Sequence, residues 1–514
     1  MKRWLFIGIL ILGFFLRFYK LGIVPSSLHE DEVGVGYNAF TLLTTGKDEH
    51  GVTRPLTLRE DAPPLIFYSD VPAIAIFGLT ELAVRLPSAT VGVLTLVAFY
   101  WLSWELGGLL RRYQPKAPSP STVALIGMLL LAIVPWHVQL TRIVHGAEYA
   151  LLLQVLALAS FFAFLRQHRS LFLYLSGIFF GLGFYPYHST RLTSPLLFAF
   201  LLWFFRKELR QAKKQTWTAV LCAVLIALPV VMYVLATPLP QTRFGGVNIF
   251  IGEKKDLGLL VRFPLKLTTQ FLTQLNLRTL FFDSSNTRYF NVRGSGLLNL
   301  AGLPFLLYGL WWLRKTRLLH FLLMWFFISL LPGALTLGAL NGGRAAGVLP
   351  VLTWLMGVGV VVFWKQYQST VYAFILATVF LLGLFLNNYF NVSPYLFSKA
   401  WQYGLKEAVV DVTAQESNYD QIIFDRTLRQ AYVYVLYYGH KPLDWVLSGK
   451  PVRNPVVGYV AFHSYEFRAV DWNKDLYQPR TLIVVPADKV PADVIPTSQI
   501  RDLNGVPVIS LVSR

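Results

Sequence analysis

Apolar stretches long enough to cross a membrane alternate with short polar segments over the first 390 residues. A bilayer core about 30 Å thick requires about 20 consecutive apolar residues in a helix. The first stretch runs from Trp4 to about Val24, and no small-residue cleavage site follows it, so we interpret it as an uncleaved span. Together with ten further stretches it predicts a bundle of about eleven transmembrane helices. The ten stretches lie near 86–109, 121–140, 147–165, 171–187, 193–205, 217–236, 297–313, 318–340, 345–364 and 370–390.

The connections between these spans carry charge in a regular pattern. Alternate connections are short and basic, and they contain Arg111, Arg112 and Lys116; Arg166 and Arg169; Arg206, Lys207, Arg210, Lys213 and Lys214; Arg314, Lys315 and Arg317; and Lys365. The positive-inside rule places these connections and the N-terminus in the cytoplasm. Only 14% of the residues are charged, against about 25% in soluble domains. The basic cytoplasmic connections of a membrane protein therefore account for much of the net charge of +19, and we expect no nucleic-acid partner.

Three longer segments fall on the predicted outer side: 25–85, 237–296 and the tail from Asn391. The tail combines helical and strand patterns, which predicts a soluble extracytoplasmic α/β domain over 391–514, following a transmembrane domain over 1–390. We expect a multi-pass protein of the inner or plasma membrane. The predicted helices of the tail are Lys399–Glu416 and Leu428–Tyr438, and its predicted strands are Gln421–Asp425, Val456–Phe462, Thr481–Val485 and Val506–Val512.

The first outer loop is strongly acidic in an otherwise basic chain. Between Ser26 and Glu81 there are nine acidic and three basic residues. After Glu32, apolar residues recur at helical spacing (Val33, Tyr37, Phe40 and Leu43), which predicts an interfacial helix with Asp31 and Glu32 at its N-terminus. The helix dipole there favours ionised carboxylates. The alternative interpretation is an acidic surface loop with a helix cap.

Single Arg and His residues recur where predicted spans meet the outer face. Arginine can bind a phosphate through two parallel hydrogen bonds, although each of these residues could instead be an anchor at the membrane surface. An acidic loop at the same face as these cations predicts a site in which one part activates an acceptor and another binds a lipid phosphate. The candidate substrate-binding residues are His29, Glu30, Arg59, Asp61, Arg85, Arg142, His188, Arg191 and Arg344.

Three short motifs in the N-terminal part resemble the GT-C superfamily of membrane glycosyltransferases, in particular the protein O-mannosyltransferases and lipid A aminoarabinose transferases of the family 39 type. They are Asp31-Glu32 with Tyr37-Asn38-Ala39-Phe40, then Pro63-Pro64-Leu65, then the segment 81–88. The resemblance implies a helical bundle that transfers a hexose or aminopentose from a polyprenyl-phosphate donor to a protein hydroxyl, a glycolipid or an envelope glycan, by inverting displacement.

The resemblance also implies roles for individual residues. Asp31 would be the catalytic base, with Glu32 beside it. Relatives often carry Lys before the paired prolines, whereas this chain has Asp61-Ala62, which leaves Arg59, Arg191 or Arg344 for the donor phosphate. Some relatives use a divalent metal ion. His29, Glu30 and Glu32 could bind one here, but their spacing does not demand it.

Two other classes of protein remain as alternatives. A flippase or transporter of lipid-linked sugars would place ionisable residues in the middle of spans, often at broken helices. A scaffold without catalytic activity would not need acids and arginines at the same face. The sequence leaves the sugar and the acceptor open.

Overall fold

The computed structural model describes residues 2–59, 61–238, 244–253, 256, 258–284, 292–454 and 458–513, and these form two compact units. Unit 1 comprises Met1–Tyr19 and Ser88–Asn388, and unit 2 comprises Lys20–Pro87 and Tyr389–Arg514. The predicted division at residue 390 assigned the first outer loop to the transmembrane part of the chain. In the structure this loop packs with the tail instead.

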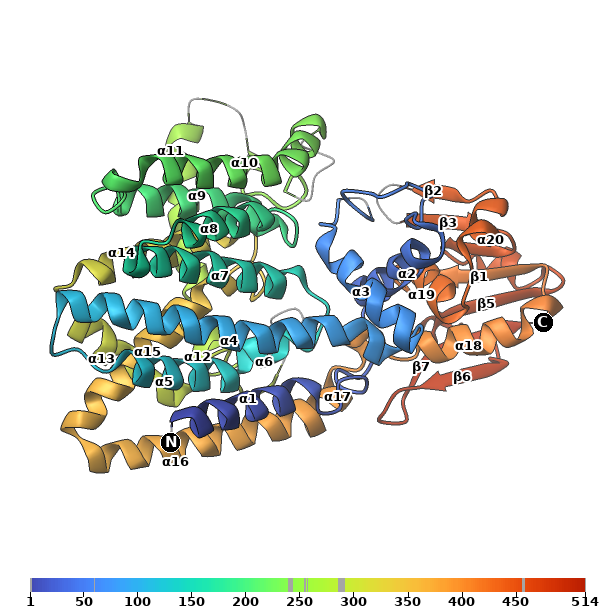
Figure 1. Cartoon of the computed structure of the whole chain (residues 1–514). Helices are drawn as coiled ribbons and strands as arrows, with labels where there is room; N and C mark the ends of the chain where they lie inside the picture. Colours follow the sequence, from blue (N-terminus) through green and yellow to red (C-terminus); the bar gives the residue numbers. More distant parts are fainter. Residues whose placement is uncertain are drawn as a thin grey trace. The chain divides into compact units, whose positions relative to one another are not determined.

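Unit 1 is helical throughout (Figure 1). Two of its helices, Leu303–Leu313 and Leu349–Gln366, approach closely because each carries a glycine where they meet. A Cβ atom at Gly359 would overlap the carbonyl oxygen of Phe305, and one at Gly309 would overlap that of Leu355. Small residues allow such close backbone contact between membrane helices. The helices are α1 (Lys2–Phe18), α4 (Glu81–Tyr113, whose first turns belong to unit 2), α5 (Pro120–Ile133), α6 (Pro135–Leu140), α7 (Gly146–Gln167), α8 (Ser170–Leu182), α9 (His188–Phe204), α10 (Lys213–Ala236), α11 (Leu259–Gln274), α12 (Leu277–Phe281), α13 (Leu303–Leu313), α14 (Arg317–Ala334), α15 (Leu349–Gln366) and α16 (Gln368–Asn387).

In the part of the chain that the structure describes, six helical segments are long and apolar enough to cross a membrane: Glu81–Tyr113, Gly146–Gln167, Arg210–Ala236, Arg317–Ala334, Ala346–Gln366 and Gln368–Leu396. The chain is therefore a multi-pass membrane protein, but the predicted count of eleven spans is not confirmed. The other five predicted spans correspond to helices of 11 to 17 residues. At 1.5 Å per residue these are shorter than a bilayer core of about 30 Å. The predicted span 121–140, for example, is divided by Pro135 into α5 and α6.

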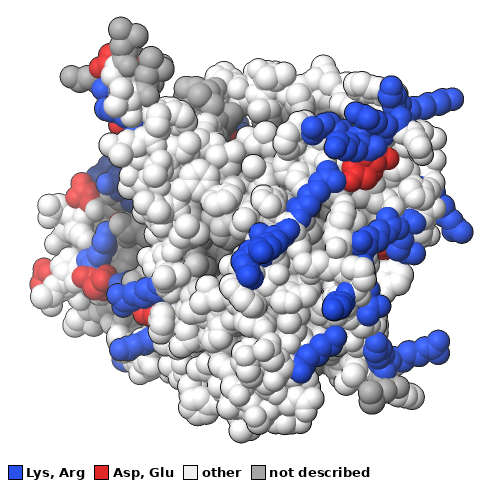
Figure 2. All heavy atoms as spheres, turned by 90° about the vertical axis from the view of Figure 1, so that its left-hand side faces the viewer, with Lys and Arg blue, Asp and Glu red and all other residues white. Residues whose placement is uncertain are grey.

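The basic connections of unit 1 lie together. They join α4 to α5, α7 to α8, α9 to α10, α13 to α14 and α15 to α16, and Figure 1 shows them at the left-hand end of the helices. Figure 2 views this end and shows many Lys and Arg side chains with few acidic ones. Two of the acids in this part of the chain are paired, Glu105 with Arg166 at 2.8 Å and Glu208 with Arg317 at 2.7 Å. The positive-inside interpretation requires such clustering of charge at one end.

Unit 2 is built around a seven-stranded sheet with the strand order β2-β3-β4-β1-β5-β7-β6. The central strand β1 runs parallel to β4 and β5, and the remaining pairs are antiparallel. The strands are β1 (Gln421–Asp425), β2 (Val452–Asn454), β3 (Gly458–Phe462), β4 (Tyr465–Arg468), β5 (Thr481–Pro486), β6 (Ser498–Arg501) and β7 (Pro507–Ser513). The helices of this unit are α2 (Glu30–Thr45), α3 (Leu65–Phe77), α17 (Ser393–Leu396), α18 (Leu405–Gln415), α19 (Ala431–Tyr438), α20 (Leu443–Ser448) and α21 (Trp472–Asp475).

The α/β prediction for the tail is confirmed. The four predicted strands correspond to β1, β3, β5 and β7, and the two predicted helices correspond to α18 and α19. Residues 455–457, where one predicted strand begins, lie outside the described residues. The remaining strands β2, β4 and β6 contain three or four residues each, too few to show an alternating pattern.

The helix predicted after Glu32 is α2, which packs against α3 and α19. Val33 and Tyr37 of the predicted apolar face are fully buried, whereas Leu43 is 43% exposed. The Tyr37 hydroxyl donates a hydrogen bond to the carbonyl of Lys441 in the tail, at 3.0 Å. The N-terminal half of this helix is therefore enclosed by protein, which the apolar spacing did not predict.

Candidate active site

The first turn of α2 is fixed by a capping box. The His29 ring nitrogen Nδ1 accepts a hydrogen bond from the Asp31 backbone N–H at 3.3 Å, and the Glu32 carboxylate accepts one from the His29 N–H at 3.0 Å. Each bond satisfies an N–H group that the helix leaves without an internal partner. The three acids that follow His29 therefore start from a rigid helical turn.

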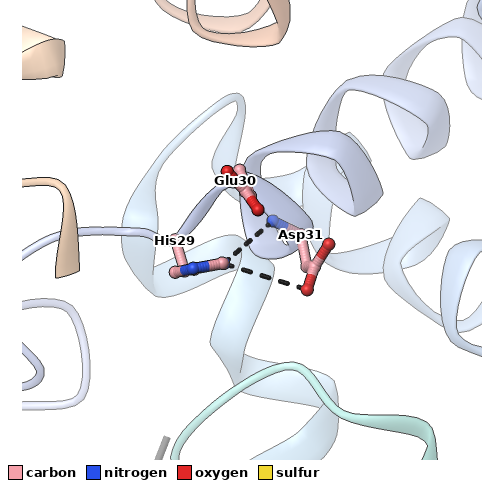
Figure 3. A group of neighbouring side chains, drawn as sticks. All are labelled: His29, Glu30 and Asp31. Atoms are coloured by element: carbon pink, nitrogen blue, oxygen red, sulfur yellow. Dashed lines mark hydrogen bonds and ion pairs between the residues drawn. The ribbon is translucent and has the colours of Figure 1, made fainter. Parts of the chain in front are cut away.

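Successive side chains of a helix point about 100° apart, and the three acids accordingly face different surroundings. Glu30 and Glu32 are buried, with 1% and 2% of their surface exposed. The side chain of Asp31 is 57% exposed and approaches the His29 ring, with Asp31 Oδ2 and His29 Nδ1 3.8 Å apart. Figure 3 shows the Asp31 carboxylate turned toward the His29 ring. Of the three carboxylates, only Asp31 is presented to solvent.

Glu32 is held by Arg85, the residue predicted to bind substrate at the start of the second span. The two carboxylate oxygens of Glu32 accept hydrogen bonds from Nε and Nη2 of Arg85, both at 3.0 Å. The other Arg85 donors reach the carbonyl oxygens of Leu21, Pro25 and Ser27 at 3.3, 2.9 and 2.6 Å. A guanidinium has five N–H donors, so none is left for a ligand. In this structure Arg85 holds the first outer loop, which its predicted role as a substrate-binding residue did not anticipate.

Glu30 is held by the tail. Arg429 donates to its carboxylate at 2.7 Å, and the Gln402 side chain contacts both the Glu30 carboxylate, at 3.3 Å, and the Glu30 backbone N–H, at 2.9 Å. A third tail residue, Tyr434, donates to the carbonyl of Leu28 at 2.8 Å. Residues of the α/β domain therefore contact the acidic first turn of α2 and enclose part of it. No signal in the sequence of the tail marked these residues.

Arg59 lies along the same turn of α2. Its Nη1 donates to the Glu30 carbonyl at 2.9 Å, and its Nη2 donates to the side chain of Gln430. A Cβ atom at position 34 would overlap this guanidinium, so the approach depends on Gly34. Arg59 was predicted to bind substrate, but its side chain is only 11% exposed. The structure uses it to join α2 to the tail.

Two buried carboxyl groups in unit 2 are poorly compensated. Both oxygens of Glu49 lack a hydrogen bond among the described residues, and Arg59 Nε is 3.7 Å away. Burial raises the pKa of Glu49, and the Arg59 charge offsets this only in part. Asp70, on α3, is fully buried, and neither of its oxygens has a hydrogen-bond partner in the described chain. Burial also raises the pKa of Asp70 well above its usual range, with a further increase from the negative charge of Glu32.

The predicted residue Asp61 lies in a tight turn before α3. Backbone hydrogen bonds between Leu58 and Ala62 close this turn at 3.0 and 2.8 Å, and Arg59 within it has a positive φ of 41°. Asp61 is 7% exposed. Its role in substrate binding stays a prediction.

The other predicted cations belong to unit 1. Arg142 is fully buried and donates to the carbonyls of Leu16 and Arg17 at 3.1 and 2.9 Å. Arg344 lines a small pocket, and its Nη1 contacts the Thr336 hydroxyl at 2.6 Å. His188 and Arg191 lie in the first turn of α9, 3.4 Å apart, beside residues that line this pocket. The polar lining comprises Gln154, Tyr187, Ser189, Thr190, Thr193, Ser329 and Arg344. The structure thus places Arg344 in a polar pocket and Arg142 inside the bundle.

Unit 1 also contains a buried polar cluster that the sequence analysis missed. Arg17 Nη2 is 2.5 Å from His137 Nδ1, and His137 Nε2 is 3.2 Å from Glu148. Glu148 also accepts a hydrogen bond from Thr95 at 2.7 Å. Arg17 lies in the last turn of α1, and Glu148 lies in the first turn of α7. The sequence signal that could have indicated this cluster is the presence of isolated charged residues within apolar stretches. Because Arg17 and Glu148 stand at helix ends, they lack the mid-span position expected of a transporter.

His29, Glu30 and Asp31 form the one group of potential metal ligands found among the described residues, with ligand atoms within 4.8 Å of one another. The fit to a cation is poor. The Nδ1 of His29 caps the helix, and Glu30 is already paired with Arg429. Glu32, the third ligand suggested by the sequence, is occupied by Arg85. A metal bound here would have to compete with a guanidinium for Glu30.

Comparison with known proteins gives a consistent result. Residues 61–233 match the sequence model of the dolichyl-phosphate-mannose-protein mannosyltransferase family. Crystal structures of ArnT from Cupriavidus metallidurans in the apo state and bound to undecaprenyl phosphate superpose on the chain with TM-scores of 0.55 at 13% and 12% identity. The alignments cover 99% and 98% of this chain and 97% of ArnT. No curated protein sequence matches. The predicted resemblance to the GT-C glycosyltransferases is therefore confirmed, as a fold over the whole chain and as a sequence pattern over residues 61–233.

Proposed function

We propose that this protein transfers a sugar from a polyprenyl-phosphate donor to a hydroxyl group of an extracytoplasmic acceptor, with inversion at the anomeric carbon. The sugar is a hexose or an aminopentose, and the acceptor is a protein, a glycolipid or an envelope glycan. The basic ends of the helices face the cytoplasm, and the acidic loop and the tail face outward. The match to a mannosyltransferase family and the likeness to an ArnT structure that binds undecaprenyl phosphate support this class of donor.

One observation carries the assignment of the base. Glu30 and Glu32 are buried in ion pairs, whereas the Asp31 side chain is 57% exposed at the N-terminus of a capped helix. The positive end of the helix dipole stabilises an ionised carboxylate at this position, and a general base must be ionised to accept a proton. The Asp31 carboxylate is therefore both accessible to an acceptor and stabilised in the ionised form that a base requires. Glu32, predicted to be catalytic beside it, holds Arg85 instead, and we assign it a supporting role.

The reaction is a single displacement. The acceptor hydroxyl attacks the anomeric carbon and transfers its proton to Asp31, while the bond between that carbon and the phosphate oxygen breaks. The electron pair leaves with the polyprenyl phosphate, whose charge changes from one negative to two. A cation beside the phosphate stabilises this increase.

The test is transfer of labelled sugar from polyprenyl-phosphate donors to membrane and envelope acceptors. Asp31→Asn keeps the shape of the side chain and removes the base, so we expect a loss of about 10²- to 10⁴-fold in rate with binding of undecaprenyl phosphate retained. Asp493→Asn, an exposed tail residue, is the matched control and should be fully active. The labelled product identifies the acceptor. Unchanged transfer by Asp31→Asn would reject Asp31 as the base.

A further inference from the structure

Three arginines contact the first turn of α2, and they differ in what they can offer a ligand. All five donors of Arg85 are bonded within the protein, and its side chain is fully buried. The Arg59 side chain is 11% exposed, and both of its terminal nitrogens bond to protein. The Arg429 side chain is 65% exposed and makes a single hydrogen bond to the described residues, from Nη2 to Glu30. Arg429 is therefore the arginine of this group with donors available to a ligand.

The backbone that carries Arg429 is held firmly. Arg429 belongs to the loop between β1 and α19, where the Asp425 carboxylate accepts the Thr427 N–H at 3.0 Å. Gln402 donates to the carbonyl of Arg429 at 3.0 Å, and its side-chain oxygen accepts the Glu30 N–H. Gln402 thus ties the Arg429 backbone to the same helical turn that the guanidinium contacts. A fixed backbone with an exposed charged end lowers the entropy cost of binding an anion.

The position of the guanidinium suits the chemistry of the leaving group. Arg429 Nη2 is 2.7 Å from Glu30 Oε1, and a Glu30 carboxylate oxygen lies within 4.8 Å of one from Asp31. In an inverting displacement the anomeric carbon stands between the base and the leaving phosphate. The cation for the phosphate should accordingly be near the base without touching it. Arg429 and Asp31 border the same turn of α2 and meet this requirement.

We propose that Arg429, supplied by the α/β domain, binds the phosphate of the lipid-linked donor and stabilises the departing polyprenyl phosphate. The inference rests on the proposed function and extends it, because it assigns a phosphate-binding residue to the tail. The guanidinium stays on Glu30 through Nη2 and directs its remaining N–H groups to the phosphate oxygens. The bonds made and broken are those of the displacement described above, and Arg429 exchanges no proton.

The experiment compares binding of undecaprenyl phosphate and of undecaprenol, which lacks the phosphate, to the detergent-purified full chain. We expect Arg429→Gln to weaken binding of undecaprenyl phosphate by about 10- to 100-fold, as for loss of hydrogen bonds to a charged group. Binding of undecaprenol should not change. Arg426→Gln removes the same charge from an exposed position of the same loop and should bind both lipids as the wild type does.

A second variant separates phosphate binding from folding. Arg429→Gln alone leaves the Glu30 carboxylate buried without its cation, which could disturb α2. Glu30→Gln combined with Arg429→Gln removes both charges and should show the same weakened binding with a normal unfolding midpoint. If this double variant binds undecaprenyl phosphate like the wild type, the role of Arg429 is structural and the inference is overturned.

The same assay distinguishes this inference from the proposed function. Sugar transfer by the wild type together with unchanged phosphate binding by Arg429→Gln would overturn the inference alone. Failure of the wild type to bind undecaprenyl phosphate and to transfer sugar would overturn both. Weakened transfer by Arg429→Gln with unchanged binding of undecaprenyl phosphate would assign the arginine to the acceptor, and that result also overturns the inference.

Discussion

Glu32 and Arg85 form a two-pronged ion pair in the interior of unit 2, with two hydrogen bonds of 3.0 Å between residues 53 positions apart. The pair joins the first turn of α2 to the start of α4. Arg85 also binds three carbonyl groups of the segment between α1 and α2. A single guanidinium thus fixes the path of the chain into the acidic turn and leaves the neighbouring Asp31 in a defined position.

The first prediction concerns this pair. Arg85→Met should destabilise the protein by about 3–5 kcal/mol, because it leaves the Glu32 carboxylate buried without a counter-charge. The measurement is denaturant unfolding of the detergent-solubilised protein. Combining Glu32→Gln with Arg85→Met should restore part of the loss, since the buried charge is then removed as well.

Lys47→Met is the control for loss of an exposed positive charge from the same loop, and it should unfold like the wild type. The sequence-based prediction for Arg85, that it binds substrate, leads to a different result. In that case Arg85→Met would unfold normally and lose affinity for the donor.

The sequence identified the acidic turn because the signal is local. Three adjacent acids precede a helical apolar pattern, and a capping histidine stands before them. The sequence could not separate the roles of the three acids, because those depend on partners far along the chain. Arg85 pairs with Glu32 over 53 residues, and Arg429 pairs with Glu30 over 399 residues. No periodic pattern records which distant arginine a carboxylate will meet.

The fold was likewise predicted where the sequence signal is local, and it was not predicted where the structure depends on contacts between distant residues. The alternation of apolar stretches and basic connections identified a multi-pass protein, and the strand patterns of the tail identified an α/β domain. The predicted number of about eleven spans is not confirmed, since apolar composition does not show where a proline such as Pro135 ends a helix early. The packing of the first outer loop against the tail depends on contacts such as that between Tyr37 and Lys441, which only the folded chain reveals.

The second prediction concerns metal dependence. Sugar transfer should be unaffected by EDTA followed by dialysis, because the potential ligands around Asp31 already have protein partners. His29 caps the helix, and Glu30 is paired with Arg429. The measurement is the transfer rate before and after chelation, and again after Zn²⁺ or Mg²⁺ is added back to the chelated protein. Loss of activity that either ion restores would make these residues metal ligands and would require Arg429 to leave Glu30.

The third prediction concerns the buried carboxyl group of Asp70. Its pKa in the folded protein is raised, first by burial and then by the charge of Glu32. Below the pKa of the unfolded chain, about 3.9, the group is protonated in both states and does not affect stability. As the pH rises above that value, the unfolded chain releases the proton and the folded protein retains it, so stability falls up to the folded pKa. Asp70→Asn removes this penalty and should raise the unfolding midpoint, by more at pH 7.5 than at pH 4.5.

Asp425 provides the control of opposite sign. Burial alone would raise its pKa, but hydrogen bonds from Thr427 and Val470 and the charge of Lys489 outweigh burial and lower the pKa. Its contribution to stability is therefore present at neutral pH and is lost as the pH falls through the folded pKa. Asp425→Asn should lower the unfolding midpoint at pH 7.5 and have less effect in acid. If Asp70→Asn also lowers the midpoint at pH 7.5, Asp70 is ionised and stabilised in the folded protein, and the prediction for Asp70 is wrong.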